Sequence, residues 1–303
     1  MTFTIEGDGL YFVSHNQANN TWRAPVLVDS AGAGRTLTNA GLTHEGNNIW
    51  LLAYSNSSTS ALDSGVHLAH VNASTAPASV SVTDIALTGG SGNLYTLPVL
   101  AALPNGDAAV IFNTYSTSTL SASLEGRVHQ SDGTLTPVFP LDDSNLGPLP
   151  NIKVVLLPTS DNQFTALWYH LDLADWDARE GLVSRRLTSA NPVGLSARTF
   201  VYPEANSASN VDFAAIRMGN AVLAVWQEIE DANPDNELNL WSARLSSTWG
   251  PAQRLEREPL VASEPHLSAR DDSAVVTWLA GPGGASSIYF AELCPAGNTA
   301  NCD

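Results

Sequence analysis

The sequence predicts an all-β protein, and three observations support this fold class. A hairpin of two apolar runs recurs along the 303 residues, no segment shows the helical 3.6-residue period, and each repeat grows more polar from its first strand to its last. Long, strand-rich repeats are typical of radial repetition, in which each blade of a ring packs against its neighbours. The sequence therefore predicts a single β-propeller of four-stranded antiparallel blades.

The repeated hairpin joins two apolar strands, here called A and B, and the B strand ends in an aromatic residue. Five plain copies occupy residues 41–54, 99–112, 154–168, 213–226 and 266–278. A sixth, weaker copy opens the chain at residues 4–16. Because A and B are apolar at nearly every position, we expect them to be covered on both faces, like the inner strands of a blade.

Two further strands, C and D, follow four of the hairpins. The C strand alternates apolar and polar residues and the D strand is the most polar, which is typical of positions nearer the rim. The C and D strands are predicted at residues 65–71 and 80–83, 126–129 and 137–139, 182–187 and 199–202, and 240–245 and 252–255. A β-solenoid is the structural alternative, but its repeats are much shorter.

The two ends of the chain bear on the number of blades. The last repeat ends after a third strand at residues 288–293, and the first repeat holds few strands. We expect the N- and C-terminal strands to share a closing blade, because a closed ring leaves no open sheet edge. Six blades are favoured, and five are the alternative.

A short tail, residues 294–303, follows the propeller of residues 1–293. A disulfide between Cys294 and Cys302 would close a small loop in this tail, and free thiols are the alternative. A disulfide indicates an oxidising compartment. We therefore expect a secreted, periplasmic or cell-surface protein whose export signal is absent from this sequence.

Charge and hydropathy exclude two classes of partner. The chain has 13 basic and 30 acidic residues, a formal charge of −17 and a single lysine, Lys153. This composition offers no basic surface for nucleic acid or for an anionic membrane. No apolar stretch approaches the roughly 18 to 20 residues of a membrane helix, so membrane insertion is not expected.

Two turns carry a family resemblance. Residues 242–249 read Ser-Ala-Arg-Leu-Ser-Ser-Thr-Trp, and Ser14-His15-Asn16 leads to Asn20-Thr21-Trp22. Both resemble degenerate forms of the Asp-box, the Ser-x-Asp-x-Gly-x-Thr-Trp turn of sialidase-like bacterial propellers with BNR repeats. In that motif the polar side chain caps the turn and the Trp fills space between strands, which is a structural role. The sequence lacks the Arg-Ile-Pro segment of sialidases, so the resemblance assigns no catalytic residue.

The loops between B and C strands are the predicted binding surface, because they emerge together with the D–A loops at one end of a propeller. Two of them, residues 170–180 and 228–237, are long and acidic. An indole flanked by carboxylates suits a sugar, whose face stacks on the ring while its hydroxyls meet the oxygens. The candidate ligand-binding residues are Trp176, Tyr115, Tyr169, Asp177 and Trp226. The alternative for Trp176 is that its ring folds back on its own blade.

The same loops suggest two further sites. Asp231, Asp235 and Asn236 could supply oxygen ligands to Ca²⁺, although a solvated acidic loop is the alternative. If the protein is a glycosidase, its paired carboxylates would come from facing loops. The candidate catalytic residues are then Asp172, Asp175, Glu228 and Glu230.

The sequence thus favours a non-catalytic extracytoplasmic module that binds glycan or protein through the B–C and D–A loops and requires no cofactor. A sialidase-like glycoside hydrolase with carboxylates in the central funnel is one alternative. A structural or interaction module of a larger surface polypeptide is the other.

Overall fold

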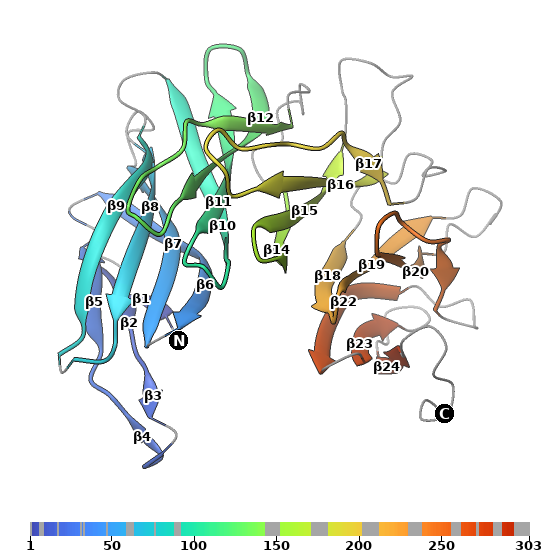
Figure 1. Cartoon of the computed structure of the whole chain (residues 1–303), viewed down its shortest axis with the longest axis horizontal. Coiled ribbons are helices and arrows are strands. Elements are labelled where there is room, and N and C mark those ends of the chain that lie inside the picture. The colour runs from blue at the N-terminus through green and yellow to red at the C-terminus, as the bar shows by residue number, and fades with distance from the viewer. Residues whose placement is uncertain are drawn as a thin grey trace. The chain divides into compact units, whose positions relative to one another are not determined.

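The computed structural model contains only strands as regular elements in the residues that it describes, and these are numbered β1 to β24 (Figure 1). The described residues are 2–5, 9–16, 18–30, 32, 34–46, 48–58, 64–75, 77–87, 92–142, 152–170, 181–201, 212–229, 238–255, 262–270, 273–280 and 287–293. The predicted all-β class and the antiparallel four-stranded sheets are confirmed.

The chain divides into two compact units. Unit 1 contains Met1–Phe164 and Leu187–Leu195, and unit 2 contains Thr165–Arg186 and Ser196–Asp303. The boundary passes through one four-stranded sheet. The strands of that sheet are β14 (Val154–Ser160), β15 (Gln163–His170), β16 (Gly181–Thr188) and β17 (Thr199–Phe200), in this order.

Unit 1 holds two complete four-stranded sheets whose strands pair antiparallel in sequence order, as predicted for A to D. The first sheet consists of β6 (Arg35–Gly46), β7 (Ile49–Ser58), β8 (Ser64–Asn72) and β9 (Ser79–Leu87) (Figure 1). The second consists of β10 (Asn93–Ala102), β11 (Ala108–Ser116), β12 (Ser121–His129) and β13 (Phe139–Asp142).

The B strand β7 is buried on both faces, which explains why nearly all of its central residues are apolar. Successive side chains of a strand point to opposite faces of the sheet. On one face Leu52 and Tyr54 pack in a cluster with Phe12. On the other face Leu51 packs in a cluster with Phe112 of β11. The strand therefore contributes to two interfaces between sheets, as expected for an inner strand.

The N-terminal strands form a smaller sheet. It consists of β1 (Thr2–Ile5), β2 (Gly9–Phe12) and β5 (Val26–Ser30), and a short hairpin of β3 (His15–Asn16) and β4 (Thr21–Trp22) is inserted between β2 and β5.

The hairpin predicted at residues 4–16 is present, but it is not an A–B pair. Phe12 at the end of β2 lies against Trp50 near the start of β7, with ring centroids 5.9 Å apart. Asp29, which pairs with Leu10 at the other end of β2, accepts a hydrogen bond from Tyr54 Oη at 2.9 Å, further along β7. Strand β2 thus runs opposite to β7, in the direction of a C strand. The hydrophobic pattern alone could not distinguish the two directions.

Unit 2 continues the same architecture. Its four-stranded sheet consists of β18 (Phe213–Met218), β19 (Ala221–Ile229), β20 (Leu238–Leu245) and β21 (Gln253–Arg254), and its three-stranded sheet of β22 (Ala262–Arg270), β23 (Ser273–Ala280) and β24 (Ser287–Leu293). Val225 and Leu240 of the first sheet pack with Val276 and Trp278 of the second. These two sheets therefore share one apolar interface.

Three features of the prediction stay open. In the described residues the N-terminal and C-terminal strands belong to separate sheets, so the closing blade and the number of blades stay predictions. Cys294 and Cys302 lie outside the described residues, and the disulfide also stays a prediction.

Over the described ranges, no helix is long and apolar enough to cross a membrane.

Candidate functional site

Most of the residues predicted for binding or catalysis lie outside the described part of the chain. They are Asp172, Asp175, Trp176, Asp177, Glu230, Asp231, Asp235 and Asn236. Glu228 lies in β19, where only its backbone is described. In the described residues no group of three or more His, Cys, Asp or Glu side chains is arranged to hold a metal ion. The acidic-loop sites therefore stay predictions.

The three remaining candidates lie in strands. Tyr115 is half-buried in β11 of unit 1, and Tyr169 is half-buried in β15 of unit 2. Trp226 in β19 is 2% exposed and lies opposite Trp241 in the sheet. The ring of Trp226 therefore belongs to the interior of unit 2 and is not available as a stacking platform in this structure.

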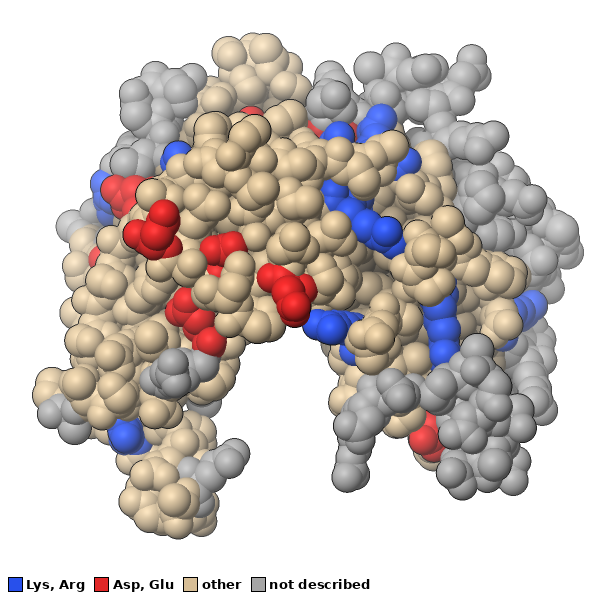
Figure 2. Space-filling view, viewed as in Figure 1, with Lys and Arg blue, Asp and Glu red and all other residues tan. Residues whose placement is uncertain are grey.

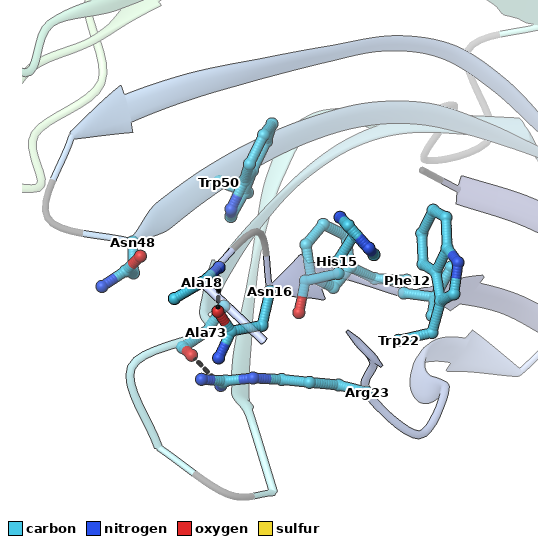
Figure 3. A pocket seen from close by; sticks show the side chains of 11 residues that line it. Phe12, His15, Asn16, Ala18, Trp22, Arg23, Asn48, Trp50 and Ala73 are labelled. Atoms are coloured by element: carbon cyan, nitrogen blue, oxygen red, sulfur yellow. Dashed lines mark hydrogen bonds between the residues drawn. The ribbon is translucent and has the colours of Figure 1, made fainter. Parts of the chain in front are cut away.

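A pocket in unit 1 brings aromatic and polar side chains together (Figure 3). Its volume is about 620 Å³, and its walls come from the β2–β5 connection, the β6–β7 turn and the β8–β9 turn. In a propeller blade the A–B and C–D turns emerge at the same end. The pocket thus lies at the end of the blades opposite to the predicted B–C loop surface.

Local hydrogen bonds shape the β2–β5 connection. Asn16 Oδ1 accepts a hydrogen bond from the backbone N–H of Ala18 at 3.0 Å, which forms an Asx turn. Asn20 adopts a left-handed backbone with φ of 51°, a conformation that Asn tolerates better than most residues. Its Oδ1 lies 3.0 Å from His15 Nε2. The Asn-rich sequence therefore produces a tight hairpin that presents His15 and Trp22.

The three turns around the pocket are tied to one another. The N–H of Ala73 donates to the carbonyl of Asn48 at 2.9 Å, which joins the β8–β9 turn to the β6–β7 turn. Arg23 Nη1 donates to the carbonyl of Ala73 and, at 3.3 Å, to that of Thr75. In Figure 3 the Arg23 side chain runs along one side of the pocket toward Ala73. These hydrogen bonds within the protein hold the three turns that form the walls of the pocket.

The aromatic residues differ sharply in exposure. Phe12 is 1% exposed and packs against the half-buried Trp50, whereas Trp22 is 61% exposed. Trp22 is supported by the ring of His15, with ring centroids 4.8 Å apart (Figure 3). An indole this exposed loses hydrophobic stabilisation unless something covers it.

The pocket combines an exposed indole with groups that donate and accept hydrogen bonds. His15, Asn16, Asn48 and Arg23 supply these polar groups. Small-molecule sites typically join apolar rings to a few placed polar groups in this way. Among the described residues no Asp or Glu lines the pocket. The pair of carboxylates that most glycosidases use is therefore not part of its described lining.

The tryptophan of the second Asp-box-like turn, Trp249, has a hydrogen-bonded environment that differs from that of Trp22. Trp249 lies in the β20–β21 turn, is half-buried, and donates its indole N–H to Ser184 Oγ of β16 at 2.8 Å. This is the structural role that the resemblance implies. Trp22 lies in the equivalent connection of the N-terminal sheet, but its indole is exposed at the pocket. The tryptophans of these two similar turns therefore differ in environment: one is half-buried and hydrogen-bonded, and the other is exposed.

We expect Trp249→Phe to lower the free energy of unfolding by about 1 to 2 kcal/mol, because it removes the hydrogen bond to Ser184. Trp22→Phe is the matched variant and should change the free energy of unfolding by less than about 0.5 kcal/mol, as exposed substitutions usually do. Urea unfolding of both variants measures the difference. Equal destabilisation by the two substitutions would contradict the different roles assigned to the two indoles.

A second polar cluster in unit 1 is buried between two sheets. The rings of His70 in β8 and His129 in β12 lie 4.7 Å apart between centroids, and in the described residues His70 Nε2 and His129 Nδ1 are buried without hydrogen-bond partners. Burial lowers the pKa of both histidines, and His70 lowers that of His129 further, while nearby Glu45, Asp132 and Asp107 oppose this shift. Burial raises the pKa of Glu45, against the effect of His129. We therefore interpret the two histidines as part of the packing between the two sheets and not as a binding site.

Comparison with known protein families gives no matching family, and comparison with curated protein sequences gives no matching relative. Solved structures, in contrast, match over most of the chain.

Three of the similar structures are informative about the fold. An ulvan lyase of a polysaccharide lyase family matches with a TM-score of 0.52 and 11% identity, covering 85% of this chain and 68% of that one. An α-L-arabinofuranosidase from Fusarium graminearum matches with a TM-score of 0.50 and 13% identity, covering 84% and 80%. The β-propeller domain of a trilobed protease from Pyrococcus furiosus matches with a TM-score of 0.50 and 9% identity, covering 94% and 74%. Together with the repeated four-stranded sheets, these similarities show that the chain has a β-propeller fold.

Proposed function

We propose that the protein binds glycan chains through the pocket that Trp22 and Trp50 line, and that it does so without cleaving them. The observation that carries this proposal is the 61% exposed indole of Trp22, which packs against the ring of His15 and lines a cavity of about 620 Å³. A flat, rigid aromatic face covers the apolar face of a sugar ring at little cost in conformational entropy. The Asn and His side chains around it can exchange hydrogen bonds with the sugar hydroxyls.

The similar structures support a glycan as the ligand. Two of them are named as an arabinofuranosidase and an ulvan lyase, so related architectures serve proteins that act on carbohydrates. The same fold supports many functions, and for this reason the proposal rests on the pocket. The described lining holds no carboxylate, which favours binding over hydrolysis. The acidic loops that contain Asp172 and Glu230 remain a predicted second surface.

A glycan array followed by titration calorimetry tests the proposal. We expect Trp22→Ala to weaken binding of the glycan selected on the array by about 2 kcal/mol or more, roughly 30-fold in Kd, as is usual for a central aromatic contact. The free energy of unfolding should stay nearly unchanged because the indole is exposed.

Phe290→Ala provides the matched control, since Phe290 is an exposed aromatic of unit 2 with 76% of its surface accessible. It should leave the Kd unchanged. Unaltered binding by Trp22→Ala would refute the assignment of the pocket. Turnover of chromogenic glycosides by the wild-type protein would refute the non-catalytic part of the proposal.

A further inference from the structure

The charge of the pocket differs from that of the chain as a whole. The chain carries 30 acidic and 13 basic residues, yet among the described residues the only charged side chain besides a histidine that lines the pocket is Arg23. On the face that Figure 2 shows, no acidic side chain is visible around the β3–β4 hairpin. The pocket is thus locally basic on an acidic protein.

The Arg23 guanidinium is fixed, and part of it is available to a ligand. Nη1 donates to the carbonyls of Ala73 and Thr75. Within the described ranges, Nε and Nη2 make no hydrogen bond, and no carboxylate pairs with the guanidinium. The side chain is exposed. A cation that is already held by protein carbonyls loses less conformational entropy when it binds an anion.

Arg23 also lies where two cavities meet. The second cavity has a volume of about 450 Å³ and shares Phe12, Ser14 and Arg23 with the first. Its other lining residues come from the start of β5 and from the β8–β9 turn, and in the described residues they include no Asp or Glu. A glycan chain that extends from one cavity into the other would pass the guanidinium.

We propose that the ligand is an acidic glycan, and that a carboxylate or sulfate group on one of its sugars pairs with Arg23. This inference rests on the proposed function and names the class of glycan for the same pocket. A guanidinium presents its N–H groups as a planar fork that matches carboxylate and sulfate oxygens. Acidic side chains at the mouth would repel such a ligand, and their scarcity here fits an anion.

Titration calorimetry with matched pairs of sugars tests the inference and identifies the anion. The first pair is trigalacturonate and its methyl ester, and the second is 6-sulfated N-acetyllactosamine and its unsulfated parent. We expect the wild-type protein to bind the acidic member of at least one pair tenfold or more tightly than the neutral member, because charge-assisted hydrogen bonds are stronger than neutral ones. The pair that shows the preference identifies carboxylate or sulfate.

Arg23→Gln should abolish the preference for the acidic member. Because this variant also loses the bonds to Ala73 and Thr75, its remaining affinity for the neutral member reports whether the pocket is still folded. Arg217→Gln is the matched control, because Arg217 is exposed and donates Nε to the carbonyl of Gly219 at 2.9 Å, far from the pocket in sequence. It should keep the preference.

Three results would overturn the inference. Equal, Trp22-dependent binding of acidic and neutral sugars would refute the acidic ligand and leave the proposed function standing. Loss of neutral-sugar binding in Arg23→Gln would show that Arg23 serves only to hold the β8–β9 turn. Absence of binding to any glycan of the array would refute the proposed function and the inference with it.

Discussion

Phe12→Ala is expected to lower the free energy of unfolding by about 3 to 5 kcal/mol, the range for a large buried aromatic that leaves a cavity. Phe12 is 1% exposed and belongs to the cluster that joins the N-terminal sheet to β7 and β8. Urea or guanidinium unfolding measures the change. The substitution should also weaken glycan binding, because Phe12 packs against Trp50 and lines both cavities.

Leu120→Ala is the control for this prediction. Leu120 is 62% exposed in the β11–β12 turn, so its loss should change the free energy of unfolding by less than about 0.5 kcal/mol. A cost below about 1 kcal/mol for Phe12→Ala would mean that the N-terminal sheet does not pack on β7 as described.

The His70–His129 pair should make the protein less stable in mild acid. Burial lowers the pKa of both histidines in the folded state, so below the unfolded value of about 6.5 the unfolded chain binds more protons than the folded one. The free energy of unfolding is therefore not reduced by these two histidines above about pH 6.5, and it decreases as the pH falls below that value. Each histidine contributes a slope of up to about 1.4 kcal/mol per pH unit.

Urea unfolding between pH 7.5 and pH 5.5 measures this slope. Glu45 has the opposite sign, because its raised pKa adds protons to the folded state and so reduces the net slope wherever it titrates. Asp107 and Asp132 are the other charged groups that act on His129. His129→Phe should reduce the slope, and an unchanged slope in this variant would assign the acid sensitivity to other groups.

The repeated hairpins could be predicted from the sequence because burial on both faces demands a run of apolar residues. The run at 213–226 is observed as β18 and β19, and the run at 99–112 as β10 and β11. The direction of the first hairpin could not be predicted, because a hydrophobic pattern reads alike in A–B and B–C pairs. Only the contacts of Phe12 with Trp50 and of Tyr54 with Asp29 define it.

The candidate site was harder to predict. The Thr-Trp sequence of the Asp-box-like turn assigns Trp22 the same structural role as Trp249. The exposure of each indole, however, depends on whether a neighbouring strand provides a partner for it. Trp249 donates a hydrogen bond to Ser184 of β16, whereas Trp22 packs against His15 and lines the pocket. One signal was available in the sequence: the connection that holds Trp22 is rich in Asn and is followed directly by Arg23.

The indole N–H resonances of the eight tryptophans offer the most direct test of glycan binding at the pocket. Phe substitutions of Trp22, Trp50 and Trp249 assign their signals, and the protein is then titrated with the glycan that binds most tightly on the array. We predict that the Trp22 and Trp50 signals shift with a common saturation curve while the Trp249 signal stays in place. A glycan that saturates the protein without moving the Trp22 and Trp50 signals would contradict the account.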